Sequence, residues 1–195
     1  LEEFGVQHIT GLNITPMQVE RARQRAAERG VSDRLELFVG SATEMPFEAA
    51  SFTKVTGLEC AHHFPTREKF FSEAFRVLKP GGRLALTDGI PQPGQALSLF
   101  TRMVLRRWAS PVENYYDRNV YAEKLRAIGF ENVEIRSIGN DVFPMTLRYS
   151  NLRNSGVSQD DAIVNLRPDE IEPGLREWSK LGLTDYVVAT ADKPA

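Results

Sequence analysis

The sequence contains almost no cysteine and no long apolar run, and each absence excludes a class of protein. Cys60 is the single cysteine in 195 residues, which excludes an internal disulfide framework and favours the reducing cytoplasm. No run approaches the roughly 18 consecutive apolar residues of a transmembrane helix, and residues 1–5 lack the basic and apolar regions of a signal peptide. We therefore expect a cytoplasmic protein without integral membrane association.

An excess of positive charge is missing as well. The 24 Lys and Arg residues face 26 Asp and Glu residues, so the formal net charge of −2 provides no polybasic surface for nucleic acid or an anionic membrane. Hydrophobic residues make up 42% of the chain and charged residues 26%, which is ordinary for a packed domain and excludes disorder. We expect one folded domain over residues 1–195 that acts on a small molecule, with no nucleic acid as partner.

What the sequence does contain is an alternation of strands and helices. The apolar patterns predict strands at residues 8–13, 35–39, 54–58 and 83–87, with helices at 16–30 and 66–79. Strands that alternate with helices pair in parallel through right-handed crossovers, so we expect an α/β fold with a mostly parallel sheet and helices on both faces. Ligands bind beyond the carboxyl ends of such strands, which directs attention to the loops that follow them.

Two segments in the second half do not fit compact crossovers. Residues 94–118 hold an amphipathic apolar stripe, and residues 140–183 form a long insertion between strands expected at 133–138 and 186–190. Long insertions are usually functional, so we predict that both segments form a helical lid over a bound substrate. The apolar stripe also fits plain core packing or the surface of a homodimer.

Three motifs carry a family resemblance: Gly11–Asn13, Gly40–Phe47 and above all Arg76–Leu84, with the sequence RVLKPGGRL. The last is the most specific, because a helix, a Pro-Gly-Gly turn and a strand must follow in that order. Over most of residues 1–138 the chain resembles class I S-adenosylmethionine-dependent methyltransferases. Within that class, Glu59–Phe64 together with Asp88 resembles small-molecule O-methyltransferases of the natural-product sugar type.

This resemblance implies a fold, a cofactor and a reaction. The fold is Rossmann-like with a helical lid, and the cofactor is S-adenosyl-L-methionine. The reaction is methyl transfer to a hydroxyl oxygen of a small or lipid-like metabolite in secondary metabolism.

The glycine-rich loop of this family is absent from the chain, since nothing like G-x-G-x-G occurs before Asn13. In the family fold the strand before that loop lies between the strands expected at 8–13 and 54–58, and its loss would leave two unpaired edges. We therefore expect the chain to be part of a longer polypeptide, with a βα unit of the order of 30 residues preceding Leu1.

The resemblance places cofactor contacts at Asn13, Gln18, Ser41, Ala42 and Leu58. Asn13 stands where many members hold the ribose hydroxyls with an acidic residue, and its amide oxygen accepts a weaker hydrogen bond than a carboxylate. Gln18 is either a second polar contact or half of a capping box with Thr15 at a helix start. Ser41 stands where the family often has an Asp facing the adenine, while Ala42 offers its backbone amide.

The candidate catalytic residues are His63, His62 and Asp88. Histidine is the natural general base near neutral pH and would remove the hydroxyl proton during methyl transfer. Adjacent residues on a strand point to opposite sides, so we expect one histidine at the reaction centre. We choose His63 because it directly precedes Phe64 and Pro65, where the chain leaves the strand end. Asp88 would orient the base or bind the acceptor, unless it is a turn or capping residue.

Three alternatives stay open. The same fold also performs N- or C-methylation. A metal-dependent hydrolase using Glu59, His62 and His63 is conceivable, although no C-x-x-C or H-E-x-x-H pattern accompanies them, and we expect no metal site. A methyltransferase-like domain that binds a partner without catalysis is the third, because Asn13 and Ser41 depart from the family pattern.

Overall fold

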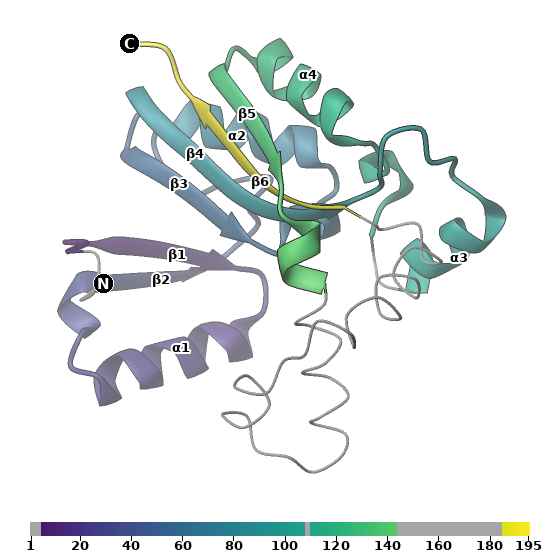
Figure 1. Cartoon of the computed structure of the whole chain (residues 1–195). Coiled ribbons are helices and arrows are strands. Elements are labelled where there is room, and N and C mark those ends of the chain that lie inside the picture. Colours follow the sequence, from purple (N-terminus) through teal and green to yellow (C-terminus); the bar gives the residue numbers. More distant parts are fainter. Residues whose placement is uncertain (1–4, 108–109, 144–184) are drawn as a thin grey trace. The chain divides into compact units, whose positions relative to one another are not determined.

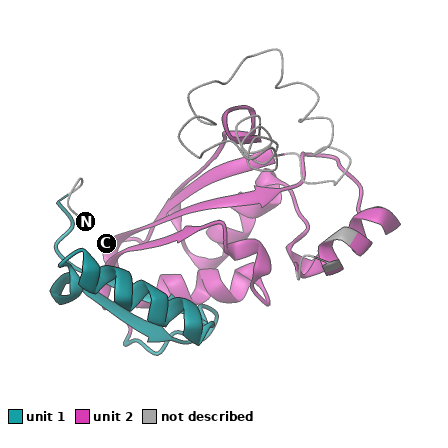
Figure 2. Cartoon of the chain, turned by 90° about the horizontal axis from the view of Figure 1, so that it is seen from below, with its two compact units in different colours: residues 1–48 teal, residues 49–195 magenta. Residues whose placement is uncertain are grey.

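The computed structural model describes residues 5–107, 110–143 and 185–195. The chain forms two compact units, residues 1–48 and residues 49–195, which are coloured separately in Figure 2. Both units combine strands with helices, so the predicted α/β class is confirmed. Within the described ranges, no helix combines the length and the apolarity needed to cross a bilayer.

The unit of residues 1–48 is a parallel β-α-β motif. Strand β1 (Ile9–Asn13) leads into helix α1 (Pro16–Glu28), and the 3-10 turn η1 (Ser32–Arg34) precedes strand β2 (Leu35–Val39), as Figure 1 shows. The two strands pair in parallel, with Ile9 opposite Leu35. Proline at the first position of α1 loses no needed donor, and the helix buries Val19 and Ala26.

The start of α1 differs from the predicted capping box. The Thr15 side chain makes no capping hydrogen bond, and the Gln18 amide donates instead to the Thr15 backbone carbonyl at 3.0 Å. The Gln18 side-chain oxygen accepts from Asn13 Nδ2 at 2.8 Å. The capping prediction is therefore wrong, because the Asn13 amide at the strand end engages the Gln18 side chain.

The unit of residues 49–195 contains a four-stranded sheet in the order β3-β4-β6-β5 (Figure 1). Its elements in chain order are β3 (Phe52–Leu58), η2 (Ala61–His63), α2 (Arg67–Val77), β4 (Leu78–Ile90), α3 (Leu99–Arg107), η3 (Val112–Asn114), α4 (Arg118–Ile128), β5 (Glu131–Ser137) and β6 (Asp185–Asp192). Strands β3 and β4 run parallel, whereas β6 runs antiparallel to both β4 and β5. Strand β6 therefore lies inside the sheet, between two strands that precede it in the sequence.

The core of this unit lies between the sheet and the helices α2 and α4, which pack against each other. Phe71 of α2 contacts Tyr121 of α4 with ring centroids 5.1 Å apart, and both side chains are fully buried. Every second residue near the end of β4 is buried: Leu84, Leu86, Asp88 and Ile90. A carboxylate thus occupies a position in an otherwise apolar row, and burial of a charge requires a partner.

The helix expected within residues 94–118 is shorter than predicted. Helix α3 begins after Ser98, whose side-chain oxygen accepts from the Thr101 amide at 3.0 Å and so caps the helix. Ser110 lies outside the helix, because the residue preceding a proline is biased away from helical angles. Most of the second expected lid segment, residues 140–183, lies outside the described residues.

Candidate active site

The carboxyl ends of β3 and β4 bring His62 and Asp88 together. In the parallel pair, Leu58 at the end of β3 lies opposite Thr87 of β4, so Asp88 follows directly at the same edge. The chain leaves β3 through Glu59, which has a left-handed φ of 52°, and enters the turn η2. His62 Nδ1 then lies 2.8 Å from Asp88 Oδ1. The predicted meeting of a histidine with Asp88 is found at this edge.

The histidine that contacts Asp88 is His62, although the sequence analysis favoured His63 as the partner of Asp88. The rings of His62 and His63 lie 4.0 Å apart, so the expectation that they point in opposite directions is wrong. Residues 61–63 form a 3-10 turn, and side chains do not alternate there as they do on a strand. The role of His63 as a base stays a prediction.

Asp88 is held by a second residue, Arg67, which the sequence analysis did not identify. Arg67 Nε donates to Asp88 Oδ2 at 2.7 Å, and Arg67 Nη2 donates to the Gly89 carbonyl at 3.0 Å. The side chains of Arg67 and Asp88 are 1% and 0% exposed, so the pair lies in a low-dielectric interior. Burial by itself raises the pKa of Asp88, but the Arg67 charge and the His62 hydrogen bond outweigh it and hold that pKa below its usual value.

The segment after α3 fixes the turn that carries His62. The Ser110 hydroxyl and the Asn114 side-chain amide both donate to the His62 carbonyl, at 2.8 and 3.1 Å. Asn114 also donates to the Phe64 carbonyl at 2.8 Å and accepts from the Arg67 backbone amide at 2.9 Å. Part of the predicted lid, residues 110–114, therefore makes direct contact with the histidine turn.

Tyrosines surround the buried ion pair. The Arg67 guanidinium lies over the rings of Tyr116 and Tyr121, at 5.0 and 5.4 Å from their centroids. Burial raises the pKa of both hydroxyls, so both stay protonated at neutral pH.

Burial, together with the charge of Asp88, also raises the pKa of the Cys60 thiol to about 11.

The metal alternative finds no ligand cluster in the part of the chain that the structure describes. No three His, Cys, Asp or Glu side chains there lie close enough to hold an ion. The Glu59 side chain instead faces Tyr186, and burial together with this contact raises the Tyr186 pKa to about 12.

The predicted cofactor residues are divided between the two units. In the first unit, Asn13 and Gln18 form an exposed pair joined at 2.8 Å, and Asn13 Oδ1 accepts from the Thr15 amide at 2.8 Å. The Ser41 hydroxyl lies 2.9 Å from that of Thr43, and Ala42 is half-buried. In the second unit Leu58 is 76% exposed at the end of β3. The amide pair at the end of β1 therefore presents uncharged donors and acceptors to solvent, which fits the hydroxyls of a ribose.

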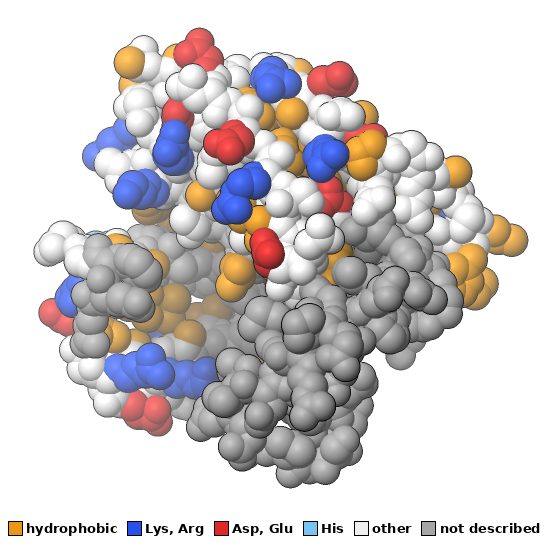
Figure 3. Space-filling model, viewed as in Figure 1, with side chains coloured by type: hydrophobic (Ala, Val, Ile, Leu, Met, Phe, Trp, Pro, Cys, Tyr) orange, Lys and Arg blue, Asp and Glu red, His pale blue; other side chains and the backbone are white. Residues whose placement is uncertain are grey.

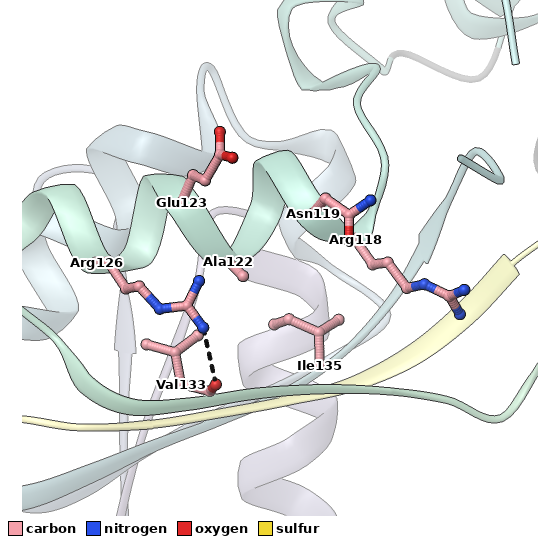
Figure 4. A pocket seen from close by; sticks show the side chains of 7 residues that line it. All are labelled: Arg118, Asn119, Ala122, Glu123, Arg126, Val133 and Ile135. Carbon is pink, nitrogen blue, oxygen red and sulfur yellow. Dashed lines mark hydrogen bonds between the residues drawn. The ribbon is translucent and has the colours of Figure 1, made fainter. Parts of the chain in front are cut away.

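A groove elsewhere on the second unit has a volume of about 620 Å³ and holds none of these residues (Figure 4). It lies between α4 and β5, where Arg126 Nη2 donates to the Val133 carbonyl at 3.4 Å. On the face drawn in Figure 3, basic and acidic side chains are interspersed over this unit, as the net charge near zero leads one to expect.

Comparison with known proteins places the chain in a family. A family model described as a methyltransferase domain matches residues 1–86. The chain is 37% identical over 207 residues to erythromycin 3''-O-methyltransferase of Saccharopolyspora erythraea, covering 100% of this chain and 67% of that protein. It is 32% identical over 189 residues to 27-O-demethylrifamycin SV methyltransferase of Amycolatopsis mediterranei, covering 95% and 69% of the two chains.

A solved structure gives the same answer for the fold. Geranyl diphosphate C-methyltransferase of Streptomyces coelicolor superposes with a TM-score of 0.72 at 22% identity, over 95% of this chain and 65% of that one. The predicted Rossmann-like fold is thereby confirmed. The sequence motifs, the fold and two relatives above 30% identity agree, and the chain belongs to the class I S-adenosylmethionine-dependent methyltransferases.

Proposed function

We propose that this enzyme transfers the methyl group of S-adenosylmethionine to a hydroxyl oxygen of a small metabolite, with His62 as the general base. The observation that carries the proposal is the contact of 2.8 Å between His62 Nδ1 and Asp88 Oδ1 at the carboxyl ends of β3 and β4. The two relatives that exceed 30% identity over 95% or more of this chain are an O-methyltransferase by name and one named for an O-demethyl compound, which supports oxygen as the acceptor atom. C-methyltransferases match at 41–45% identity, but over only about 40% of the chain.

In this proposal the two ring nitrogens of His62 have different tasks. Ionised Asp88 has only acceptors, so Nδ1 of His62 carries the donated hydrogen and Nε2 is left with its lone pair. Nε2 can then take the proton of the acceptor hydroxyl as the new bond to oxygen forms. The cofactor supplies an electrophilic methyl group, and the protein therefore has mainly to position the reactants and manage one proton.

Five residues are proposed to contact the cofactor. We assign the ribose to the exposed pair Asn13 and Gln18, the adenine edge to Ser41 and the backbone amide of Ala42, and an apolar contact to Leu58. Replacing Asn13 with Ala removes one neutral hydrogen bond, which is typically worth about 1 kcal/mol. The dissociation constant for S-adenosylmethionine should therefore rise roughly fivefold in calorimetry, and an unchanged value would remove Asn13 from the site.

Residues 94–107 and 110–118 belong to the proposed lid over the acceptor and are described by the structure. Leu99, Phe100 and Met103 of α3 are more than half exposed, whereas Ser110 and Asn114 hold the His62 carbonyl. An apolar surface connected to the histidine turn fits an acceptor with a hydroxyl on a broad apolar body.

The test is turnover of His62→Ala with erythromycin that lacks its 3''-O-methyl group and with 27-O-demethylrifamycin SV as acceptors. General-base assistance contributes about 10²- to 10⁴-fold, so His62→Ala should lose that factor and the fall in rate at low pH. His63→Ala is the matched variant, because it removes the neighbouring ring and leaves the Asp88 contact intact. Loss in His63→Ala with normal turnover in His62→Ala would move the base to His63. A methyl group found on carbon or nitrogen of the product would refute the oxygen assignment.

A further inference from the structure

We infer that Arg67 is a positioning residue that neutralises Asp88, so that Asp88 orients His62 without drawing a permanent proton onto its ring. The inference rests on the proposed function in one respect, since it takes His62 as the base. The inference concerns the charge balance among Arg67, Asp88 and His62. Its effect on the titration of the His62 ring can be measured without an acceptor.

Asp88 Oδ2 accepts from Arg67 and, at 3.5 Å, from the Tyr121 hydroxyl, whereas Oδ1 faces His62. Oδ2 accepts from Arg67 Nε at 2.7 Å, and Oδ1 lies 2.8 Å from His62 Nδ1. Arg67 and Asp88 are fully buried, while the His62 side chain is 20% exposed. A substrate can therefore reach the histidine, but water does not screen the charges behind it.

Arg67 is fixed independently of Asp88. Its guanidinium donates to the carbonyls of Gly89 and Asn114 and lies over the rings of Tyr116 and Tyr121. A planar group with five donors suits this arrangement, and its charge persists at any pH at which the protein folds. The carboxylate therefore always faces a cation in a set position.

The other titratable groups around Asp88 do not supply this charge. Cys60 at the start of the turn η2 and Tyr186 of β6 are neutral near pH 7, because burial raises their pKa values to about 11 and about 12. Tyr121 of α4 is neutral for the same reason. On the turn itself, Glu59 faces Tyr186, and the His63 ring lies against His62.

The consequence for catalysis follows from charge pairing. A buried carboxylate beside a histidine favours the imidazolium form, which has no lone pair to accept a proton. With Arg67 in place, Asp88 and Arg67 together carry no net charge, so His62 keeps the orientation given by the hydrogen bond and also stays available as a base. Removal of the Arg67 charge should favour the protonated form of His62. Removal of the Asp88 charge should favour the neutral form.

The test is the pH titration of the His62 ring by NMR in the purified full chain without added acceptor, with the resonance assigned through His62→Gln. In Arg67→Gln the midpoint should rise by about 1 pH unit or more, and in Asp88→Asn it should fall. Arg67→Lys, which keeps the charge, should stay near the wild type. Arg76→Gln is the matched control, because Arg76 lies on the same helix and pairs with Glu73 and not with Asp88. Equal midpoints in Arg67→Gln and the wild type would overturn the inference.

The double variant Arg67→Gln/Asp88→Asn keeps the inference testable if Arg67→Gln alone does not fold. With both charges removed, the His62 midpoint should return to the wild-type value from the lower value of Asp88→Asn. A double variant that titrates like Asp88→Asn would contradict the neutralising role of Arg67. The methylation assay separates this inference from the proposed function. If the NMR midpoint shifts as expected and the low-pH limb of kcat does not follow it, Arg67 acts as inferred and His62 is not the base.

Discussion

Two ion pairs in this protein share an Arg Nε contact of 2.7 Å but differ in burial, and burial should decide what each contributes to stability. The exposed pair even has a second hydrogen bond, from Arg83 Nη2 to Asp192 Oδ2 at 3.0 Å. Arg67 Nε lies 2.7 Å from an oxygen of Asp88, and Arg83 Nε lies 2.7 Å from an oxygen of Asp192. The first pair is fully buried, whereas the Arg83 and Asp192 side chains are 55% and 23% exposed. Replacement of each aspartate with asparagine is therefore a matched experiment on the two environments.

Asp88→Asn should lower the free energy of unfolding by about 3 kcal/mol, because removal of one partner of a buried pair leaves an uncompensated guanidinium in the core. The figure is at the low end of the usual range, since asparagine keeps the shape and one acceptor oxygen. Asp192→Asn should cost close to nothing, because exposed ion pairs contribute little. Urea unfolding at pH 7, followed by circular dichroism, measures both costs.

The same comparison predicts a pH dependence. The pKa of Asp88 is lower in the folded protein than its usual value of 3.8, so its contribution is complete above that value and is lost as the pH falls through the folded pKa. The stability gap between the wild type and Asp88→Asn should thus narrow as the pH falls below about 4. Equal costs for the two variants, or a gap that does not narrow between pH 5 and pH 3, would refute the reasoning.

Two further predictions concern single groups. Lys193 Nζ donates to the Phe75 and Leu78 carbonyls at 2.8 Å each, at the end of α2. Lys193→Met should therefore lower the free energy of unfolding by about 1 to 2 kcal/mol in the same urea assay. An effect below about 0.3 kcal/mol would mean that water replaces the lysine. Because the pKa of Cys60 is raised to about 11, little of the thiol is ionised at pH 8. Iodoacetamide should therefore alkylate the folded protein at pH 8 roughly 100-fold more slowly than the urea-unfolded chain. Equal alkylation rates would contradict the burial of the thiol.

Local sequence patterns predicted most of the helices and strands, but not how distant strands pair. The strand at residues 35–39 has the predicted bounds, since its apolar run and its flanking turns are local signals. The placement of β6 inside the sheet was not predictable in this way, because its pairing with β4 joins residues about 100 positions apart and no local pattern specifies such a partner.

The site followed the same division. The meeting of a histidine with Asp88 was predictable, because parallel strands end at one edge. The choice between His62 and His63 was not predictable, because it depends on a 3-10 turn for which the sequence has no local signal. Arg67 left a signal that could have been used: it stands three and four positions before Phe70 and Phe71, in line with the buried face of α2.

The central position of β6 has a consequence for synthesis of the protein on the ribosome. Strands β4 and β5 emerge first, and roughly 50 further residues must be added before Asp185–Asp192 can pair with both. At typical elongation rates of about 5 to 20 residues per second, the facing edges of the two strands stay open for about 3 to 10 s. Open edges of this kind pair readily with other chains. Nascent chains that stall or terminate within this interval should therefore be the main source of aggregates, and chaperones that cover strand edges should raise the yield of folded enzyme more than any stabilisation of the finished sheet.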